Sequence, residues 1–275
     1  MQRMSFMWNI ALSTYRKNRI GIKRATPWSL IIYRIVEGFT SIALPFFIYR
    51  FFLHGAMTDD FHRYSGGADY ITYVVLGLSL NVLAVSTLMN IGRALMTEMR
   101  QGTLEPLLLS PASRPGYFLG CLMEQTSRAL LEFGAMLIFG FILGARLNLL
   151  FSFEAIFAIL LAMFSFFCFG VFLSSIMLFT RDTFIVQNTL FTVMTLVCGV
   201  LFPIEFLPRF VQVIAQIFPL TPAVALFRNV AIAGMNLSDN LFLIAQILVT
   251  SVIFVILGGK WLKRIEKSLV DKIFG

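Results

Sequence analysis

Charged side chains are scarce in this sequence. Only 13% of its 275 residues are Asp, Glu, Lys or Arg, whereas 58% are hydrophobic and the mean hydropathy is +0.84. A water-soluble domain of this length needs a wettable outer shell, so the composition predicts a protein that is surrounded by lipid. The net charge of +8 does not imply a nucleic-acid partner, because the positions of the cations along the chain explain it better.

Residues that build catalytic or metal sites are also few. The cysteines, Cys121, Cys168 and Cys198, lie in apolar runs without paired spacing, so we expect neither a disulfide framework nor a metal site. The two histidines, His54 and His62, fall in one predicted external loop. A membrane-embedded enzyme would need a cluster of His, Asp and Glu or a Ser and His pair at membrane depth. We therefore predict a non-catalytic protein.

Charge-free stretches locate the membrane spans, because a helix that crosses about 30 Å of hydrocarbon needs about 20 apolar residues. Four such stretches are long enough to cross: 70–92, 155–180, 183–204 and 240–259. Two shorter apolar runs, 38–49 and 133–145, must take flanking charges into the membrane. The sequence thus predicts an all-α polytopic membrane protein with six spans, at about 30–53, 69–92, 118–145, 155–180, 183–204 and 238–259.

Lysine and arginine set the orientation of these spans. Most of the 22 cations lie before the first span, in the loop 93–116, or after the last span. The other face holds fewer cations, and acidic residues such as Asp59 and Asp239 dilute them. The cation-rich side is therefore predicted to be cytoplasmic, with both ends of the chain on that side.

The segment 205–230 tests the span count. Its charge-free part, 210–227, could be a seventh span, but the basic C-terminus would then lie outside. Prolines at four positions break any long helix in this region: Pro203, Pro208, Pro219 and Pro222. We therefore predict short external re-entrant helices that enter the outer half of the membrane without crossing it.

The two ends of the chain are amphipathic or basic. Residues 6–24 mix aromatic and aliphatic side chains with a cluster of cations, which predicts a helix within 1–28 on the cytoplasmic membrane surface. Residues 260–275 form a basic cytoplasmic tail. We find no internal repeat and no linker, so 1–275 is predicted to be a single membrane domain.

The most informative segment is the predicted cytoplasmic loop 93–116. Its leucines recur at roughly helical spacing beside charged residues, which favours a short amphipathic helix with an apolar partner surface. Gly102 permits a sharp turn. Thr103 can cap the following helix, with Glu105 in its first turn, where an acid is favoured. Pro111 would end this helix.

The pattern E-x-x-x-G-T-L-E-x-L-L-x-S-P that begins at Glu98, followed by Tyr117 and Gly120, resembles the membrane subunit of ABC-2 type transporters. The proline-rich segment after the fifth span, together with Arg228, resembles the external re-entrant region of that family. The resemblance covers essentially the whole chain. It implies that the loop is a coupling helix that contacts an ATPase subunit, through the following residues: Glu98, Gly102, Thr103, Leu104, Glu105, Leu108 and Pro111.

The resemblance also implies partners. An exporter of this kind would contain two membrane subunits, identical or similar, in a bacterial cell membrane. Two ATPase subunits would bind to them from the cytoplasm. The phosphate-binding pattern G-x-x-x-x-G-K-[ST] does not occur in this sequence; its nearest approach, 258–261, lacks the Ser or Thr for magnesium. ATP and Mg2+ are therefore expected on the partner ATPase, and no cofactor is expected on this chain.

Five charged residues fall within or beside predicted spans. Arg34 and Glu37 belong to the first span, and Glu124, Arg128 and Glu132 recur on one face of the third. A charge inside the membrane costs at least about 2.5–3.5 kcal/mol, which makes these residues candidates for a relay between the coupling helix and the spans. The alternative is intrahelical pairing at the cytoplasmic boundary, with long side chains that reach the headgroups. The sequence leaves both interpretations open.

Several questions about transport stay open at this point. Thirty phenylalanines suit a cavity for an amphipathic drug, lipid or peptide, although packing against lipid is the simpler use of these residues. Export of a polysaccharide or glycolipid is the alternative within the same family. An ion-coupled secondary transporter would show inverted repeats and carboxylates near the midplane, and we see no repeat.

Overall fold

The computed structural model describes residues 2–25, 29–52, 54–55, 57–103, 106, 114–147, 149–180 and 189–274. Every secondary-structure element within these residues is a helix, which confirms the all-α prediction. The α-helices are α1 (Gln2–Ala25), α2 (Ser29–Phe47), α3 (Asp59–Tyr64), α4 (Tyr70–Arg100), α6 (Arg114–Ile142), α7 (Phe153–Thr180), α8 (Phe191–Val197), α9 (Arg209–Ala215), α10 (Leu220–Ala231) and α11 (Leu241–Phe274). A π-helical turn, Ile48–Phe52, follows α2, and 3-10 turns at Ile204–Phe206 and Leu237–Asn240 precede α9 and α11.

Three helices of the described residues are long and apolar enough to cross a membrane: Tyr70–Arg100, Phe153–Thr180 and Leu237–Leu262. They coincide with the predicted spans 69–92, 155–180 and 238–259. The pair α9 and α10 has the composition of a fourth span, but the two helices are bent by 89° at their junction. The count of six spans stays a prediction.

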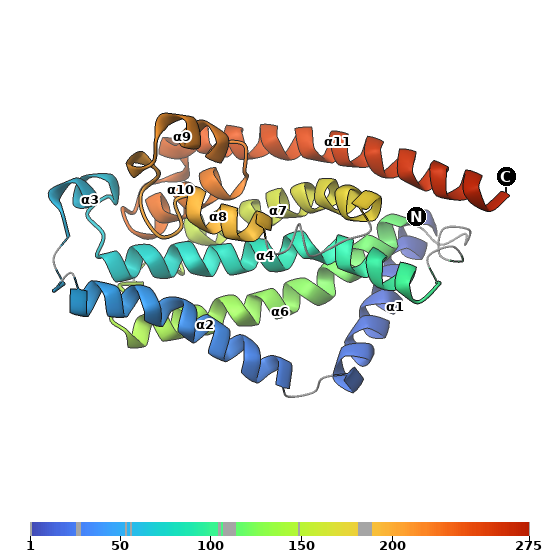
Figure 1. Cartoon of the computed structure of the whole chain (residues 1–275), viewed down its shortest axis with the longest axis horizontal. Helices are drawn as coiled ribbons and strands as arrows, with labels where there is room; N and C mark the ends of the chain where they lie inside the picture. Colours follow the sequence, from blue (N-terminus) through green and yellow to red (C-terminus); the bar gives the residue numbers. More distant parts are fainter. Residues whose placement is uncertain are drawn as a thin grey trace.

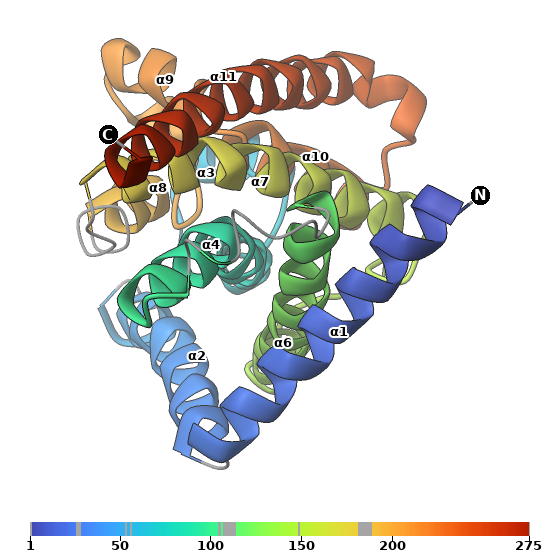
Figure 2. The same cartoon turned by 90° about the vertical axis from the view of Figure 1, so that its right-hand side faces the viewer.

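The two ends of the bundle differ in what they carry (Figure 1). The N-terminal helix α1 and the C-terminal end of α11 lie at one end, and α3, α9 and α10 lie at the other. Helix α1 runs across the bundle axis and packs against α6 (Figure 2). Both termini therefore lie at the same end of the molecule, which is the arrangement that two cytoplasmic termini require.

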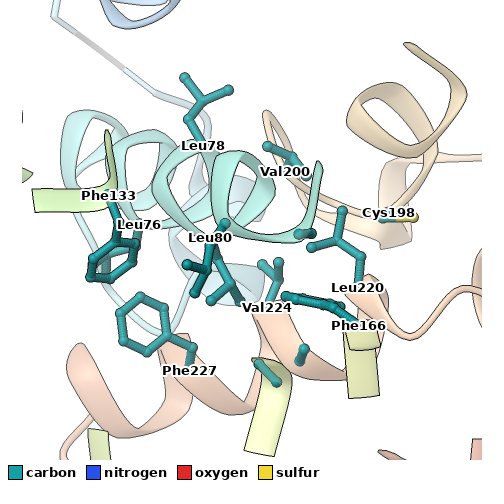
Figure 3. Close-up of a cluster of buried hydrophobic side chains, with 14 of the residues drawn as sticks. Leu76, Leu78, Leu80, Phe133, Phe166, Cys198, Val200, Leu220, Val224 and Phe227 are labelled. Carbon is teal, nitrogen blue, oxygen red and sulfur yellow. The ribbon is translucent and has the colours of Figure 1, made fainter. Parts of the chain in front are cut away.

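Helix α4 is the centre of the fold. It packs against α6 and α7, and α2 and α11 lie on opposite sides of it. Residues 72–80 are buried around the whole circumference of the helix, as expected for a helix enclosed by other helices. Leucines of α4 meet Phe133 of α6, Phe166 of α7 and Phe227 of α10 in one apolar core (Figure 3).

Burial decreases outward from α4. The most apolar stretch of α4 is 81% buried, that of α7 is 50% buried, and that of α11 is only 22% buried. The exposed residues of α11 are mostly Leu, Val, Ile and Phe. An apolar surface of this length is incompatible with water and fits contact with lipid or another membrane subunit.

The structure changes several predicted boundaries. Helix α4 continues to Arg100, so the first part of the loop predicted at 93–116 is helical. Residues 260–274, predicted as a basic tail, continue α11. The helix in the fifth predicted span ends at Val197 instead of near 204, because Gly199 adopts a left-handed φ of 73° and turns the chain. The start of that predicted span, 183–188, lies outside the described residues.

Helices α7 and α11 approach each other closely at Gly258. A Cβ atom on this glycine would lie 2.7 Å from backbone atoms of Phe172. The Ser175 hydroxyl donates a hydrogen bond to the carbonyl oxygen of Gly258 at 3.1 Å, and Phe169 packs against Phe254 with ring centroids 4.5 Å apart. Small residues allow this contact, as is usual between membrane helices.

We expect Gly258→Ala to destabilise the protein by about 1–3 kcal/mol, because α7 must move to admit the methyl group. Gly259→Ala is the matched control, since a Cβ there meets nothing within 4 Å. It should leave stability unchanged or raise it slightly through better helix propensity. Thermal unfolding of the detergent-purified variants measures both effects, and equal melting temperatures for the two variants would contradict this packing.

Candidate functional site

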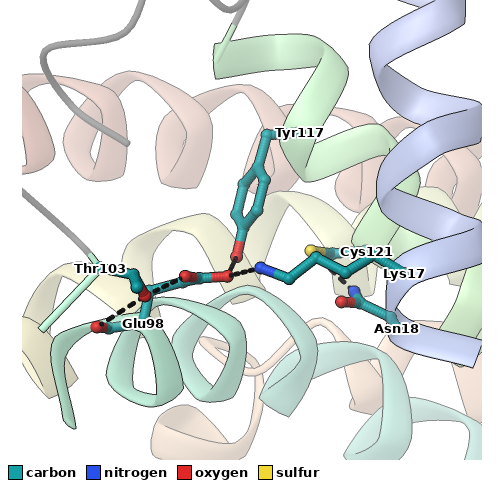
Figure 4. Close-up of polar contacts among 6 residues, drawn as sticks. All are labelled: Lys17, Asn18, Glu98, Thr103, Tyr117 and Cys121. Atoms are coloured by element: carbon teal, nitrogen blue, oxygen red, sulfur yellow. Dashed lines mark hydrogen bonds and ion pairs between the residues drawn. The ribbon is translucent and has the colours of Figure 1, made fainter. Parts of the chain in front are cut away.

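The first candidate site surrounds Glu98 at the end of α4, beyond the predicted span 69–92 (Figure 4). Its carboxylate accepts hydrogen bonds from the Lys17 ammonium of α1 at 2.6 Å and from the Tyr117 hydroxyl of α6 at 3.3 Å. The Thr103 hydroxyl donates to the second carboxylate oxygen. Glu98 therefore joins α1, α4, α6 and the start of the following loop. We call these four residues the Glu98 cluster.

Glu98 is only 6% exposed, so its charge depends on these partners. Burial alone would raise the pKa of Glu98. The hydrogen bonds from Lys17, Thr103 and Tyr117 and the charge of Lys17 outweigh burial and hold the pKa below its usual range. Because the group is an ionised acceptor, all three partners can donate to it at once.

The backbone explains why the pattern E-x-x-x-G-T places these groups together. Gly102 has a left-handed φ of 69°, and its amide donates to the carbonyl oxygen of Met99 at 3.2 Å. The amide of Thr103 donates to the carbonyl oxygen of Glu98 at 2.9 Å. This pair of bonds is a Schellman motif, which ends a helix and requires the left-handed residue. The turn brings the Thr103 side chain back onto the Glu98 carboxylate.

The remaining coupling residues predicted from the sequence, Leu104, Glu105, Leu108 and Pro111, lie outside the described residues. Lys17 and Tyr117 are the partners that sequence reasoning did not assign. Tyr117 is part of the matched pattern, and so is Gly120, where a Cβ atom would collide with the carbonyl oxygen of Ala11 in α1. Gly120 thus lets α1 lie close to α6, and this contact brings Lys17 within reach of Glu98.

The charged residues of the predicted relay lie on α2 and α6. Arg128 forms an ion pair with Glu124 at 2.9 Å within α6, which is the i, i+4 pairing of the simpler interpretation. Glu132 accepts a hydrogen bond from Ser86 of α4 at 3.1 Å. Glu37 is exposed on α2, and the side chain of Arg34 is outside the described part of the structure.

The second candidate site lies at the opposite end, around the buried Arg228 of α10. Its guanidinium donates hydrogen bonds to the carbonyl oxygens of Gly199 at 2.6 Å, Val200 at 2.7 Å and Tyr73 at 2.8 Å. The guanidinium carbon lies 3.4 Å from the centre of the Tyr73 ring, within cation–π distance. Arg228 therefore fixes α10 to α4 and to the turn that ends α8.

Local sequence supports this arrangement. Gly77 of α4 faces the site, where a Cβ would collide with Arg228 and with the carbonyl oxygen of Val200. The predicted prolines begin the short helices: Pro203, Pro208 and Pro219 each precede a helical segment, and Pro222 lies in the first turn of α10. Proline is tolerated at these positions because amides at a helix start make no intrahelical hydrogen bond.

An apolar helical bundle with helices long enough to cross a bilayer, and with polar clusters at its two ends, defines a polytopic membrane protein. A family model described as ABC-2 type transporter matches residues 22–232. The chain therefore belongs to the ABC-2 type transporter family, as its membrane, or permease, component. A comparison with curated proteins gives no match.

We expect Lys17→Met to weaken the Glu98 cluster, because the carboxylate loses its cationic partner. Lys17 is largely exposed, so we expect a loss of about 1 kcal/mol. Hydrogen–deuterium exchange at the Thr103 amide should accelerate by roughly fivefold. The control is Arg16→Met, which removes an exposed cation next to Lys17 on α1. Equal exchange in both variants would show that Lys17 does not hold the turn.

Proposed function

We propose that this chain is the membrane-spanning subunit of an ATP-driven exporter and that a separate cytoplasmic ATPase drives it. In this proposal the chain crosses the membrane six times with both ends in the cytoplasm. Two copies, or one copy and a similar subunit, form the translocation path, and two ATPase subunits bind below it. Membership of the ABC-2 family supports the proposal.

The observation that carries the proposal is the Glu98 cluster. The segment that resembles a coupling helix begins directly after Gly102 and Thr103, at the end of the bundle where both termini lie. The end of α4 that precedes it is tied to α1 and α6 through Glu98 by charge-assisted hydrogen bonds, which are stronger than neutral ones, and Thr103 bonds to the same carboxylate. A push on the loop would therefore move α4, α6 and α1 together instead of being absorbed by a flexible connection.

The charged residues of α2 and α6 are proposed to extend this path into the membrane. Arg34, Glu37, Glu124, Arg128 and Glu132 form the proposed relay. The hydrogen bond between Glu132 and Ser86 supports it, because that bond links α6 to α4 farther along both helices. At the other end, the buried Arg228 supports a role for α10 as a fixed outer cap on the translocation path.

The proposed substrate is an amphipathic drug, lipid or peptide. The support is compositional, since the chain holds 30 phenylalanines, and their rings suit apolar ligands better than sugar chains. A polysaccharide or glycolipid exporter is the second candidate within the family. An ion-gradient transporter is the third, and it differs from the others in needing no ATPase.

Reconstitution of the chain with its ATPase in vesicles tests the proposal. We expect the ATPase to co-purify with the chain, and vanadate to abolish transport of an amphipathic fluorescent substrate. Glu98→Gln should retain ATP hydrolysis while transport falls about tenfold or more, because the loop is no longer fixed to α1. Transport that persists in vanadate and follows an ion gradient would overturn the ATP-driven reading.

The same vesicles test the relay. Glu132→Gln should lower transport at constant ATP hydrolysis, since the carboxylate that accepts from Ser86 becomes a neutral amide. Unchanged transport together with unchanged hydrolysis would leave Glu124 and Arg128 as an intrahelical pair without a role in coupling.

A further inference from the structure

A cleft with a volume of about 360 Å³ opens beside Arg228 at the end of the bundle that holds α3 and α10. Residues from the end of α3, from α4, from the segment 198–205, from α10 and from the start of α11 line it. Tyr73, near the start of α4, lines the cleft, whereas Glu98 lies near the end of the same helix, so the two sites are at opposite ends of α4. The cleft is large enough for a lipid headgroup or a small organic molecule.

The cleft has one charge of each sign among its lining residues. Arg228 supplies the positive charge and Glu205 supplies the negative charge. No ion pair joins these two side chains, although Glu205 lies close enough for its charge to act on Arg228. The lining therefore has no net charge, but its negative charge at Glu205 and its positive charge at Arg228 are separate.

Both charges have unused bonding capacity. Arg228 is 8% exposed, and its protein partners are backbone carbonyls and the Tyr73 ring, none of which carries a negative charge. Its buried Nε–H has no hydrogen-bond acceptor among the described residues. Glu205 is exposed, and no described side chain donates to its carboxylate. Within the described part of the chain, no ion pair compensates the burial of the Arg228 charge, so a ligand that brings an anionic group to it would be stabilising.

The remaining lining is mixed, and it favours an amphiphile. Ile204, Val224, Ile232 and Leu243 provide apolar walls. Next to the cleft, α9 exposes Phe210 and Val213 to about two-thirds of their surface, which is typical of a helix at the boundary of a membrane. A ligand with an apolar part could reach the cleft from the lipid while its polar head meets the two charges.

We propose that this cleft binds the headgroup of a zwitterionic amphiphile, with its ammonium group at Glu205 and its anionic phosphodiester toward Arg228. This assignment rests on the proposed export function, because the ligand would be the class of molecule that the exporter handles at its outer end. A phosphodiester fits a guanidinium that lacks an anionic partner, and the Tyr64 ring in the lining offers a further contact for the ammonium group. A purely anionic or purely cationic amphiphile satisfies one of the two charges and is repelled by the other.

Binding to the full chain in maltoside detergent, without the ATPase, tests this site. The probes are short-chain phosphatidylethanolamine, short-chain phosphatidylglycerol, an alkyltrimethylammonium and free phosphoethanolamine. We expect the phosphatidylethanolamine to bind about fivefold tighter than either singly charged amphiphile, as one extra ion pair near the surface provides. Free phosphoethanolamine should bind more weakly than the lipid, because it lacks the apolar part.

Glu205→Gln should remove the preference for the zwitterion over phosphatidylglycerol. Asp239→Asn is the matched control, because Asp239 is also an acid in a short 3-10 helix but does not line the cleft. Equal affinity for the three amphiphiles, or the same affinities in both variants, would overturn the site. If free phosphoethanolamine bound as tightly as the lipid, the ligand would not need an apolar part, and the assignment of an amphiphile would be wrong. Because the ATPase is absent, these results are independent of whether ATP drives transport.

Discussion

The end of the bundle that carries both termini depends on the ionised carboxylate of Glu98. This carboxylate accepts hydrogen bonds from an ammonium group and two hydroxyl groups that belong to different segments of the chain. Removing one partner from a buried charge leaves a desolvated group without compensation, which costs more than the bond itself contributes. Glu98 thus fixes the position of α1, the end of α4 and the start of α6 relative to one another, and with them the origin of the proposed coupling loop.

The end of the bundle that holds α3, α9 and α10 uses the opposite charge in a similar way. Arg228 is buried and donates to carbonyl oxygens from α4 and from the turn after α8. Two of these oxygens, on Gly199 and Val200, lie where Gly199 takes the chain out of the helix, and the Tyr73 hydroxyl also donates to the Gly199 carbonyl oxygen. Between the two ends, α4 is enclosed by apolar side chains of α6, α7 and α10. A polar cluster at each end and an apolar middle are what a bilayer demands of a helical bundle.

The sequence predicted the features that depend on local composition. Charge-free runs located α4, α7 and α11, because a helix needs about 20 apolar residues to cross a bilayer. The pattern at Glu98 and Gly102 identified the family and the turn, since a left-handed helix end needs glycine. The prolines at 203–222 predicted that no long helix forms there, and the helices α9 and α10 are short. These signals are local and therefore readable from one sequence.

Other features depend on contacts between distant residues, and no local pattern reveals them. Lys17 is separated from Glu98 by 81 positions and looks like one cation among several on α1. Tyr73 is separated from Arg228 by 155 positions, and its ring lies under the guanidinium only once α4 and α10 have packed. The end of α8 at Val197 was not predicted, because the apolar run continues past Gly199 and gives no sign of the turn there. Hydropathy reports burial, and it does not report where the backbone changes direction.

Photo-crosslinking tests the central claim, that the loop after the Glu98 cluster contacts an ATPase, most directly. A benzophenone side chain would replace Leu108 in the loop, and in a second variant it would replace the exposed Phe210 of α9 at the other end of the bundle. We predict that the probe at 108 crosslinks to the ATPase in intact cells and that the probe at 210 does not. Crosslinks from position 108 to lipid alone, with no ATPase adduct, would contradict it.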